Sequence, residues 1–145
     1  MGFVKGVVGS FGASMCFALL FHIPRRCLVA ASVTGLVGYV AYMLAMLLFG
    51  SPIGANFIGA FIAALLSEWL ARRQKAPAII YSMIGIVPLV PGAGLYRTML
   101  GLVLKKYDQA LAVGVETVLI AAGIAFAVAL VTVMMRLLRH VARAN

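Results

Sequence analysis

Five long apolar stretches run along the chain, at residues 3–22, 28–49, 54–71, 78–104 and 110–135. About 20 helical residues cross the ~30 Å hydrocarbon core of a bilayer, which is close to the length of each stretch. Short polar, glycine-containing or proline-containing segments separate them, at residues 22–26, 50–54, 72–77 and 105–109. Because short connections force neighbouring helices to run antiparallel, the pattern predicts an all-α, polytopic transmembrane protein. We expect five spans in a single membrane domain, residues 1–145.

The composition supports a membrane protein and argues against most other classes. The chain is 65% hydrophobic and 10% charged, against roughly 45–50% and about 25% in soluble domains. Its net charge of +9 does not indicate nucleic-acid binding, because nearly all twelve Lys and Arg lie between the apolar stretches. The sequence contains no metal-ligand cluster, no nucleophile–base pair and no nucleotide-binding loop. It therefore predicts neither an enzyme nor a bound metal or cofactor.

The basic residues also predict an orientation. One side of a five-span protein carries three of them, Lys5, Lys105 and Lys106. The other side carries eight, Arg25, Arg26, Arg72, Arg73, Lys75, Arg136, Arg139 and Arg143. Since cytoplasmic loops are enriched in Lys and Arg, this places the N-terminus outside and the C-terminus in the cytoplasm. The basic helix end at 136–145 is typical of a membrane interface, and Glu68 with Arg72 is typical of a surface i,i+4 ion pair.

Small residues recur at helical spacing on several of the apolar stretches. They form stripes on residues 3–22 (Gly6, Ser10, Ser14, Ala18), 54–71 (Gly59, Ala63, Ser67) and 110–135 (Ala121, Ala125, Ala129). Such stripes let helix backbones approach closely within a bilayer. We therefore expect these faces to lie at helix–helix contacts.

The fourth stretch contains a break, in the segment "VPLVPGAGLYR". Pro91 is near the middle of residues 78–104, so the break is expected near the bilayer midplane. Pro88 has no N–H to donate to the carbonyl of Ile84, and Pro91 has none for that of Val87. Both carbonyls are therefore expected to lack a partner, which is costly inside a membrane unless another group binds them.

A second half-helix is expected to begin at the break, with Pro91 in its first turn. The amides of Gly92, Ala93 and Gly94 would then lack intrahelical partners at the positive end of the helix dipole. Arg97 lies about 9 Å further along the same face, and Tyr96 adds a hydroxyl. Discontinuous transporter helices use such amides to bind anionic groups, and a guanidinium fork suits a carboxylate.

Three other interpretations of these residues stay open. The proline kink can serve only to shape helix packing. Arg97 can extend to the outer surface of the membrane. Arg97 can also pair with Glu116, which lies at a similar depth on residues 110–135, so Glu116 is assigned an ion-pair or proton-relay role.

The segment "PLVPGAGLYRTM" at 88–99 resembles the threonine/serine exporter family, most closely the small membrane subunit of its two-component members. The family signature corresponds to Pro88, Pro91, Gly92 and Tyr96, and the likeness extends over nearly the whole chain. It implies a larger partner subunit with a cytoplasmic hydrolase-like domain and about five spans. It also implies a location in the bacterial inner membrane and export of threonine and serine, or of C4-dicarboxylates such as succinate, driven by the proton-motive force.

The sequence as a whole is therefore interpreted as the small subunit of an exporter of small carboxylates that works by alternating access. In this interpretation the substrate site consists of Pro88, Pro91, Gly92, Ala93, Gly94, Tyr96 and Arg97, with the carbonyls of Ile84 and Val87. The rival interpretation is a structural subunit that supports a transporting partner and has no substrate site of its own.

Overall fold

A computed structural model describes residues 2–144, with side chains described for residues 6–138. The described residues form six α-helices and one short 3-10 helix, and no strand. The elements are α1 Gly2–Leu20, α2 Arg25–Phe49, α3 Pro52–Gln74, α4 Ala78–Ile86, η1 Val87–Leu89, α5 Gly92–Val103 and α6 Tyr107–Ala144. The predicted all-α class is confirmed. α6 continues well past residue 135, and the side chains of the basic end at 139–145 lie outside the described residues.

Glycine, serine and two lysines define the ends of the helices. α2 ends at Gly50, whose φ of 63° is readily adopted only by glycine. Ser51 caps α3, because its hydroxyl accepts a hydrogen bond of 3.5 Å from the amide of Gly54. Lys75 and Lys105 also have positive φ, 50° and 57°, and they turn the chain after α3 and α5. The chain therefore turns within each segment predicted as a connection, although the helices extend further into these segments than the sequence predicted.

α2 lies at the centre of the fold and contacts α1, α3 and α4. Its contact with α3 depends on small residues: a Cβ added at Gly38 would lie 2.9 Å from the Cβ of Ala63. On the other side, Tyr81 and Ile84 of α4 are fully buried. The hydroxyl of Thr34 donates to the carbonyl of Tyr81 at 3.2 Å, which ties α2 to α4.

The predicted small-residue stripes have different outcomes. Ser10, Ser14 and Ala18 of α1 are buried, as are Gly59, Ala63 and Ser67 of α3, so these stripes lie at helix contacts as expected. The stripe on α6 is exposed at Ala121, Ala125 and Ala129, so it does not lie at a helix contact within the described chain, and its expected contact with another helix stays a prediction. α6 uses the opposite face, with Ile120, Ile124 and Ala127, to contact the bundle.

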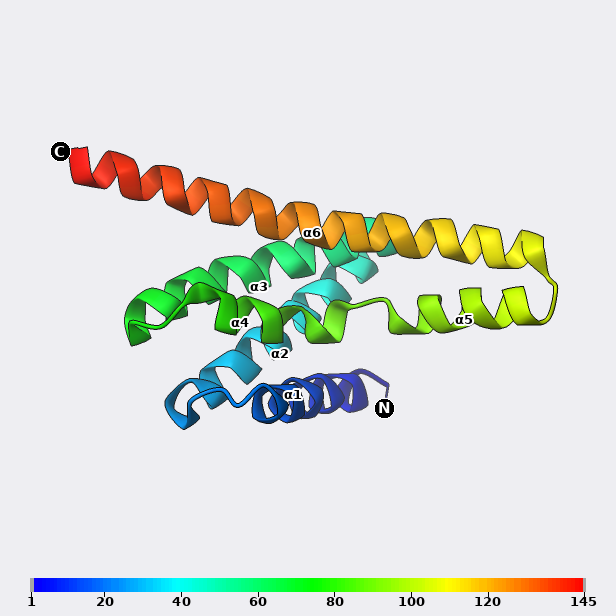
Figure 1. Ribbon diagram of the computed structural model, residues 1–145, viewed down its shortest axis with the longest axis horizontal. Coiled ribbons are helices and arrows are strands. Elements are labelled where there is room, and N and C mark those ends of the chain that lie inside the picture. Colours follow the sequence, from blue (N-terminus) through cyan, green and yellow to red (C-terminus); the bar gives the residue numbers. More distant parts are fainter. Residues whose placement is uncertain (1, 145) are drawn as a thin grey trace.

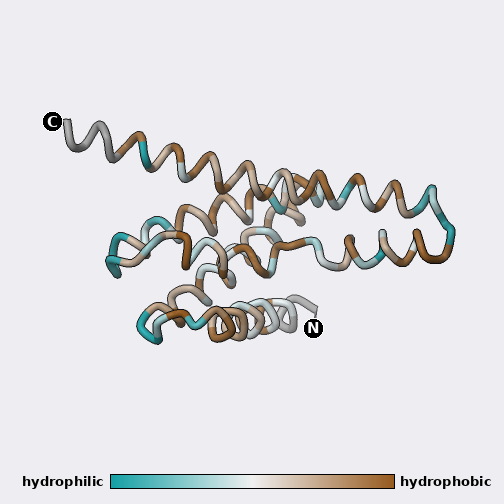
Figure 2. Tube along the Cα trace, in the orientation of Figure 1, coloured by the Kyte–Doolittle hydropathy of each residue, from teal (hydrophilic) through white to brown (hydrophobic). Residues whose placement is uncertain are grey.

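α5 and the first half of α6 form a hairpin that extends beyond the rest of the bundle (Figure 1). None of the described residues of α5 is buried, and α6 is its main contact. Polar residues gather toward the two ends of the molecule, at the turns after α1, α3 and α5, whereas the helices between are largely apolar (Figure 2). This distribution is the one expected of a protein in a bilayer.

By length and hydropathy, three helices of the described chain are able to cross a membrane: α2, α3 and α6. The count rises to four if the bent pair Ala78–Leu89 and Gly92–Val103 forms one span. The described apolar part of α1, Gly6–Leu20, is shorter than a full span. The chain is therefore an apolar helical membrane protein with three or four candidate spans, and the count of five stays a prediction.

Candidate functional site

The predicted break in the fourth apolar stretch is present. α4 tightens into the 3-10 helix Val87–Leu89, and the next two residues leave the helical conformation, Val90 with φ −60° and ψ 127° and Pro91 with φ −77° and ψ 57°. α5 then begins at Gly92, and the two halves are bent by 53°. The gap between them is visible in Figure 1 as an extended link between α4 and α5.

The carbonyls before the break are already paired. The amide of Val87 donates to the carbonyl of Ile84, and the amide of Val90 donates to that of Val87 at 3.4 Å. The prediction that proline leaves both carbonyls without a partner is therefore wrong. A 3-10 turn bonds i to i+3 and so replaces the missing i+4 donors. Ile84 is also fully buried against α2, so its carbonyl is poorly placed for a solute.

The amides after the break are only partly as predicted. The amide of Gly92 donates to the carbonyl of Val90 at 2.8 Å, which closes an inverse γ-turn at Pro91. The expectation that the Gly92 amide is unpaired is therefore wrong. Among the described residues, the amides of Ala93 and Gly94 have no acceptor, because the first helical bond of α5 runs from Leu95 to Pro91. These two amides lie at the positive end of the α5 dipole.

A cavity of about 460 Å³ opens beside the break. Its volume is within the range typical of small-molecule sites, ~300–1,000 Å³. Residues from α2, α3, the break, α5 and α6 line it: Tyr39, Tyr42, Pro52, Asn56, Pro88, Leu89, Val90, Pro91, Ala93, Gly94, Arg97, Val113, Glu116, Thr117 and Ile120. We call this space the break cavity.

The break cavity brings together most of the predicted site residues. Arg97 lines it together with Ala93 and Gly94, as their shared helix face predicts. Glu116 reaches it from α6, although no ion pair forms between Arg97 and Glu116 within 4.0 Å. Tyr96 does not line the cavity and is 67% exposed. The cavity thus combines two free amides, a guanidinium and a carboxylate.

Four polar residues of the break cavity were not singled out in the sequence: Tyr39, Tyr42, Asn56 and Thr117. The side-chain amide of Asn56 donates to the carbonyl of Pro52 at 2.8 Å, and no described residue donates to its side-chain oxygen. A lone asparagine in an apolar stretch is a usable signal, because a buried amide needs partners. Nothing in the sequence marks Tyr39 and Tyr42 as cavity residues, because only the rotation of α2 about its own axis in the folded bundle decides which way they face.

α5 is held on α6 by a row of small residues. Gly94 faces Thr117, Gly114 faces the Thr98 methyl group, and Gly101 faces Ala110. A Cβ added at Gly101 would lie 2.9 Å from the Cβ of Ala110 and 3.2 Å from its Cα. We call this contact the α5–α6 seam. Gly94 therefore also has a packing role that the sequence did not indicate, whereas a Cβ added at Gly92 would meet no atom within 4 Å.

The described side chains show no metal centre. No group of three or more His, Cys, Asp or Glu in this part of the chain is close enough together to hold an ion. The break cavity itself offers hydrogen-bond donors and charged side chains, which suit an anionic or zwitterionic solute.

Comparison with known proteins places the chain in a family. The family described as "Threonine/Serine exporter, ThrE" matches residues 6–134. The chain is similar to a threonine/serine exporter of Corynebacterium glutamicum, 31% identical over 97 residues, which cover 67% of this chain and 19% of that protein. It is also similar to an uncharacterized protein of Haemophilus influenzae, 24% identical over 122 residues, 79% of this chain and 41% of that protein.

The chain thus spans less than half the length of these two curated relatives. No solved structure matches it. The family match covers most of the chain, including the break and the residues of the break cavity. The chain belongs to the threonine/serine exporter family.

Proposed function

We propose that the chain is the small subunit of a two-component exporter of small carboxylates in the bacterial inner membrane. Its substrates are threonine and serine, or C4-dicarboxylates such as succinate. It works by alternating access and is driven by the proton-motive force. The observation that carries the proposal is the break cavity, in which two unpaired amides and Arg97 lie on one side of a solute-sized space.

In this proposal the substrate carboxylate binds between α5 and α2. The amides of Ala93 and Gly94 donate to one oxygen, and the Arg97 guanidinium donates to the carboxylate as a fork. Hydrogen bonds to a charged group contribute about 1.5–3 kcal/mol each. Two or three of them would therefore contribute about 3–9 kcal/mol to the binding of the carboxylate. Glu116 accepts an ammonium group of the substrate or relays a proton. Asn56 offers its side-chain oxygen as a further acceptor.

The proposed partner is a larger subunit with a cytoplasmic hydrolase-like domain and about five spans. Two features support a partner: α5 buries none of its described residues, and the small-residue stripe on α6 is exposed. The relatives above are also longer than this chain. With five spans and an outside N-terminus, this chain would be inverted relative to a five-span partner that begins in the cytoplasm, as in inverted-repeat transporters.

Replacement of Arg97 tests the proposal. Arg97→Gln, expressed with the larger subunit, is expected to reduce efflux of labelled threonine or succinate at least about tenfold, the equivalent of one lost charged hydrogen bond. Membrane abundance should not change, because Arg97 is exposed and forms no ion pair with Glu116. Arg73→Gln is the matched control, since Arg73 stacks on Trp69 at 4.8 Å and does not line the break cavity.

Unchanged efflux in Arg97→Gln would favour the structural-subunit alternative. In that case the kink would shape the interface with a transporting partner, and a photoactivatable substrate would label only the larger subunit. Labelling of residues 88–97 together with reduced efflux would support the proposed site.

A further inference from the structure

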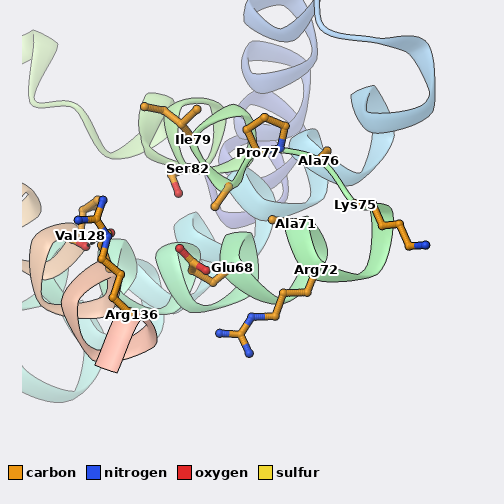
Figure 3. A pocket seen from close by; sticks show the side chains of 12 residues that line it. Glu68, Ala71, Arg72, Lys75, Ala76, Pro77, Ile79, Ser82, Val128 and Arg136 are labelled. Atoms are coloured by element: carbon orange, nitrogen blue, oxygen red, sulfur yellow. Dashed lines mark hydrogen bonds between the residues drawn. The ribbon is translucent and has the colours of Figure 1, made fainter. Parts of the chain in front are cut away.

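A second polar cavity, of about 640 Å³, lies at the other end of the same helix group. It opens between the C-terminal half of α3, the start of α4 and the C-terminal half of α6 (Figure 3). Its lining is Glu68, Ala71, Arg72, Lys75, Ala76, Pro77, Ala78, Ile79, Ser82, Val128, Thr132 and Arg136. We call it the Glu68 cavity.

Glu68 is only 8% exposed, so the expectation that this residue lies at the surface is wrong. Its carboxylate and the Ser82 hydroxyl point toward the gap between α3 and α4, whereas Lys75 points away from it (Figure 3). Arg136 and Thr132 line the cavity from α6. The hydroxyl of Thr132 donates to the Val128 carbonyl at 2.8 Å and so keeps its oxygen lone pairs for other donors.

The Glu68 cavity shares three kinds of polar group with the break cavity. Each contains a carboxylate, at least one guanidinium and a threonine hydroxyl. Each also lies at the start of a helix that follows a proline, α4 after Pro77 and α5 after Pro91. A carboxylate, a guanidinium and hydroxyls in one cavity suit a solute that carries both charges.

An apolar cluster separates the two cavities. Leu89, Ile120 and Ile124 form its centre, with Ala60 and Ala127, and all five are buried. Along α6, Thr117 lines one cavity and Thr132 the other, about 22 Å apart at 1.5 Å per residue. A solute that leaves one cavity for the other therefore has to pass or displace this cluster.

We propose that the Glu68 cavity is a second substrate site, on the opposite side of the apolar cluster, which binds the zwitterion of a hydroxyl-bearing amino acid. This rests on the transport function proposed above. Arg136 and Arg72 bind the carboxylate, Glu68 accepts the ammonium group, and Ser82 and Thr132 bond the side-chain hydroxyl. A dicarboxylate would bring a second negative charge to Glu68, which is repulsive. The site therefore selects amino acids over dicarboxylates.

Protection of an introduced cysteine tests this site. The full chain, with Cys16 and Cys27 replaced by serine and Val128→Cys added in the lining of the Glu68 cavity, is placed in phosphatidylcholine nanodiscs and alkylated with a maleimide. L-threonine at about ten times its half-protecting concentration should slow alkylation about tenfold, and succinate should not. Glu68→Gln and Arg136→Gln should each raise the half-protecting concentration of threonine about tenfold or more. Glu68→Asp, which keeps the carboxylate, should raise it less. Arg73→Gln is the control, because Arg73 lies on α3 with Glu68 but does not line the cavity. It should leave the half-protecting concentration of threonine unchanged.

The absence of protection by threonine in a chain that elutes as a folded species would overturn the second site, as would equal protection by succinate. Protection that appears without threonine when phosphatidylglycerol replaces phosphatidylcholine would assign the cavity to a lipid headgroup instead. The two proposals fail separately. Lost efflux in Arg97→Gln with no protection at residue 128 rejects only the second site, and protection with unchanged efflux in Arg97→Gln rejects only the break cavity.

Discussion

Replacement of Gly94 by alanine tests whether the α5–α6 seam positions Arg97 over the break cavity. A Cβ at residue 94 would overlap the Thr117 hydroxyl and lie 3.3 Å from the Thr117 Cβ and methyl carbon. Because the Cβ of Thr117 is fixed to the helix backbone, rotation of its side chain cannot remove the whole overlap. α5 would have to shift away from α6, and Arg97, one turn further along, would move with it.

The magnitude follows from two opposing terms. Overpacking at a helix contact costs about 1–3 kcal/mol, whereas removing a glycine from a helix contributes about 0.5–1 kcal/mol of stability. The net loss expected for Gly94→Ala is therefore up to about 2.5 kcal/mol, with a central value of about 1 kcal/mol. Gly92→Ala, two residues earlier, meets no atom within 4 Å and should be neutral or slightly stabilising.

Equilibrium unfolding in mixed detergent micelles measures these free energies. Thr117→Ala removes the overlapping hydroxyl and methyl group, so the double variant Gly94→Ala/Thr117→Ala should recover at least about 1 kcal/mol relative to the sum of the single variants. Thr117 donates only to the carbonyl of Val113 on its own helix, so Thr117→Ala alone should cost less than about 1 kcal/mol. A Gly94→Ala variant as stable as wild type, or strictly additive single effects, would refute the seam.

Two further predictions concern access to the break and the topology. Gly92→Leu should reduce efflux severalfold without loss of abundance, because the new side chain covers the approach to the Ala93 amide. Gly12→Leu on α1, which also meets no atom within 4 Å, should leave efflux unchanged, and equal effects would reject the prediction. A cysteine at Ser51 should react with an impermeant thiol reagent from outside and one at Lys75 only from inside, and the reverse pattern would reject the proposed orientation.

Local chemistry explains what the sequence could predict. A proline beyond the first turn of a helix removes a backbone hydrogen bond and interrupts the helix, so the break at Pro88 and Pro91 followed directly from the residues. Local rules also gave the turn at Gly50, where glycine readily adopts a positive φ, and the turn after α3, where Pro77 precedes α4. Arg97, Ala93 and Gly94 share a face because of helical spacing alone, and they line one cavity.

The predictions that failed depended on conformation or on distant neighbours. The Ile84 and Val87 carbonyls are paired because the chain tightens into a 3-10 turn before Pro91, which spacing does not reveal. Glu68 was expected at the surface because Arg72 follows one turn later, yet α4 and α6 cover it. Asn56 reaches the break cavity because of how α3 packs against α2 and α6, which is a tertiary property.

The central claim is that a substrate carboxylate binds to Arg97 at the helix break. Solid-state NMR measures this contact directly, through the dipolar coupling between carboxyl-¹³C threonine or succinate and ¹⁵N-labelled arginine in the complex with the larger subunit. We predict a carbon–nitrogen distance of about 4 Å, as in forked guanidinium–carboxylate pairs, that is lost in Arg97→Gln. Bound, transported substrate that shows no such coupling, or a coupling that persists in Arg97→Gln, would contradict the account.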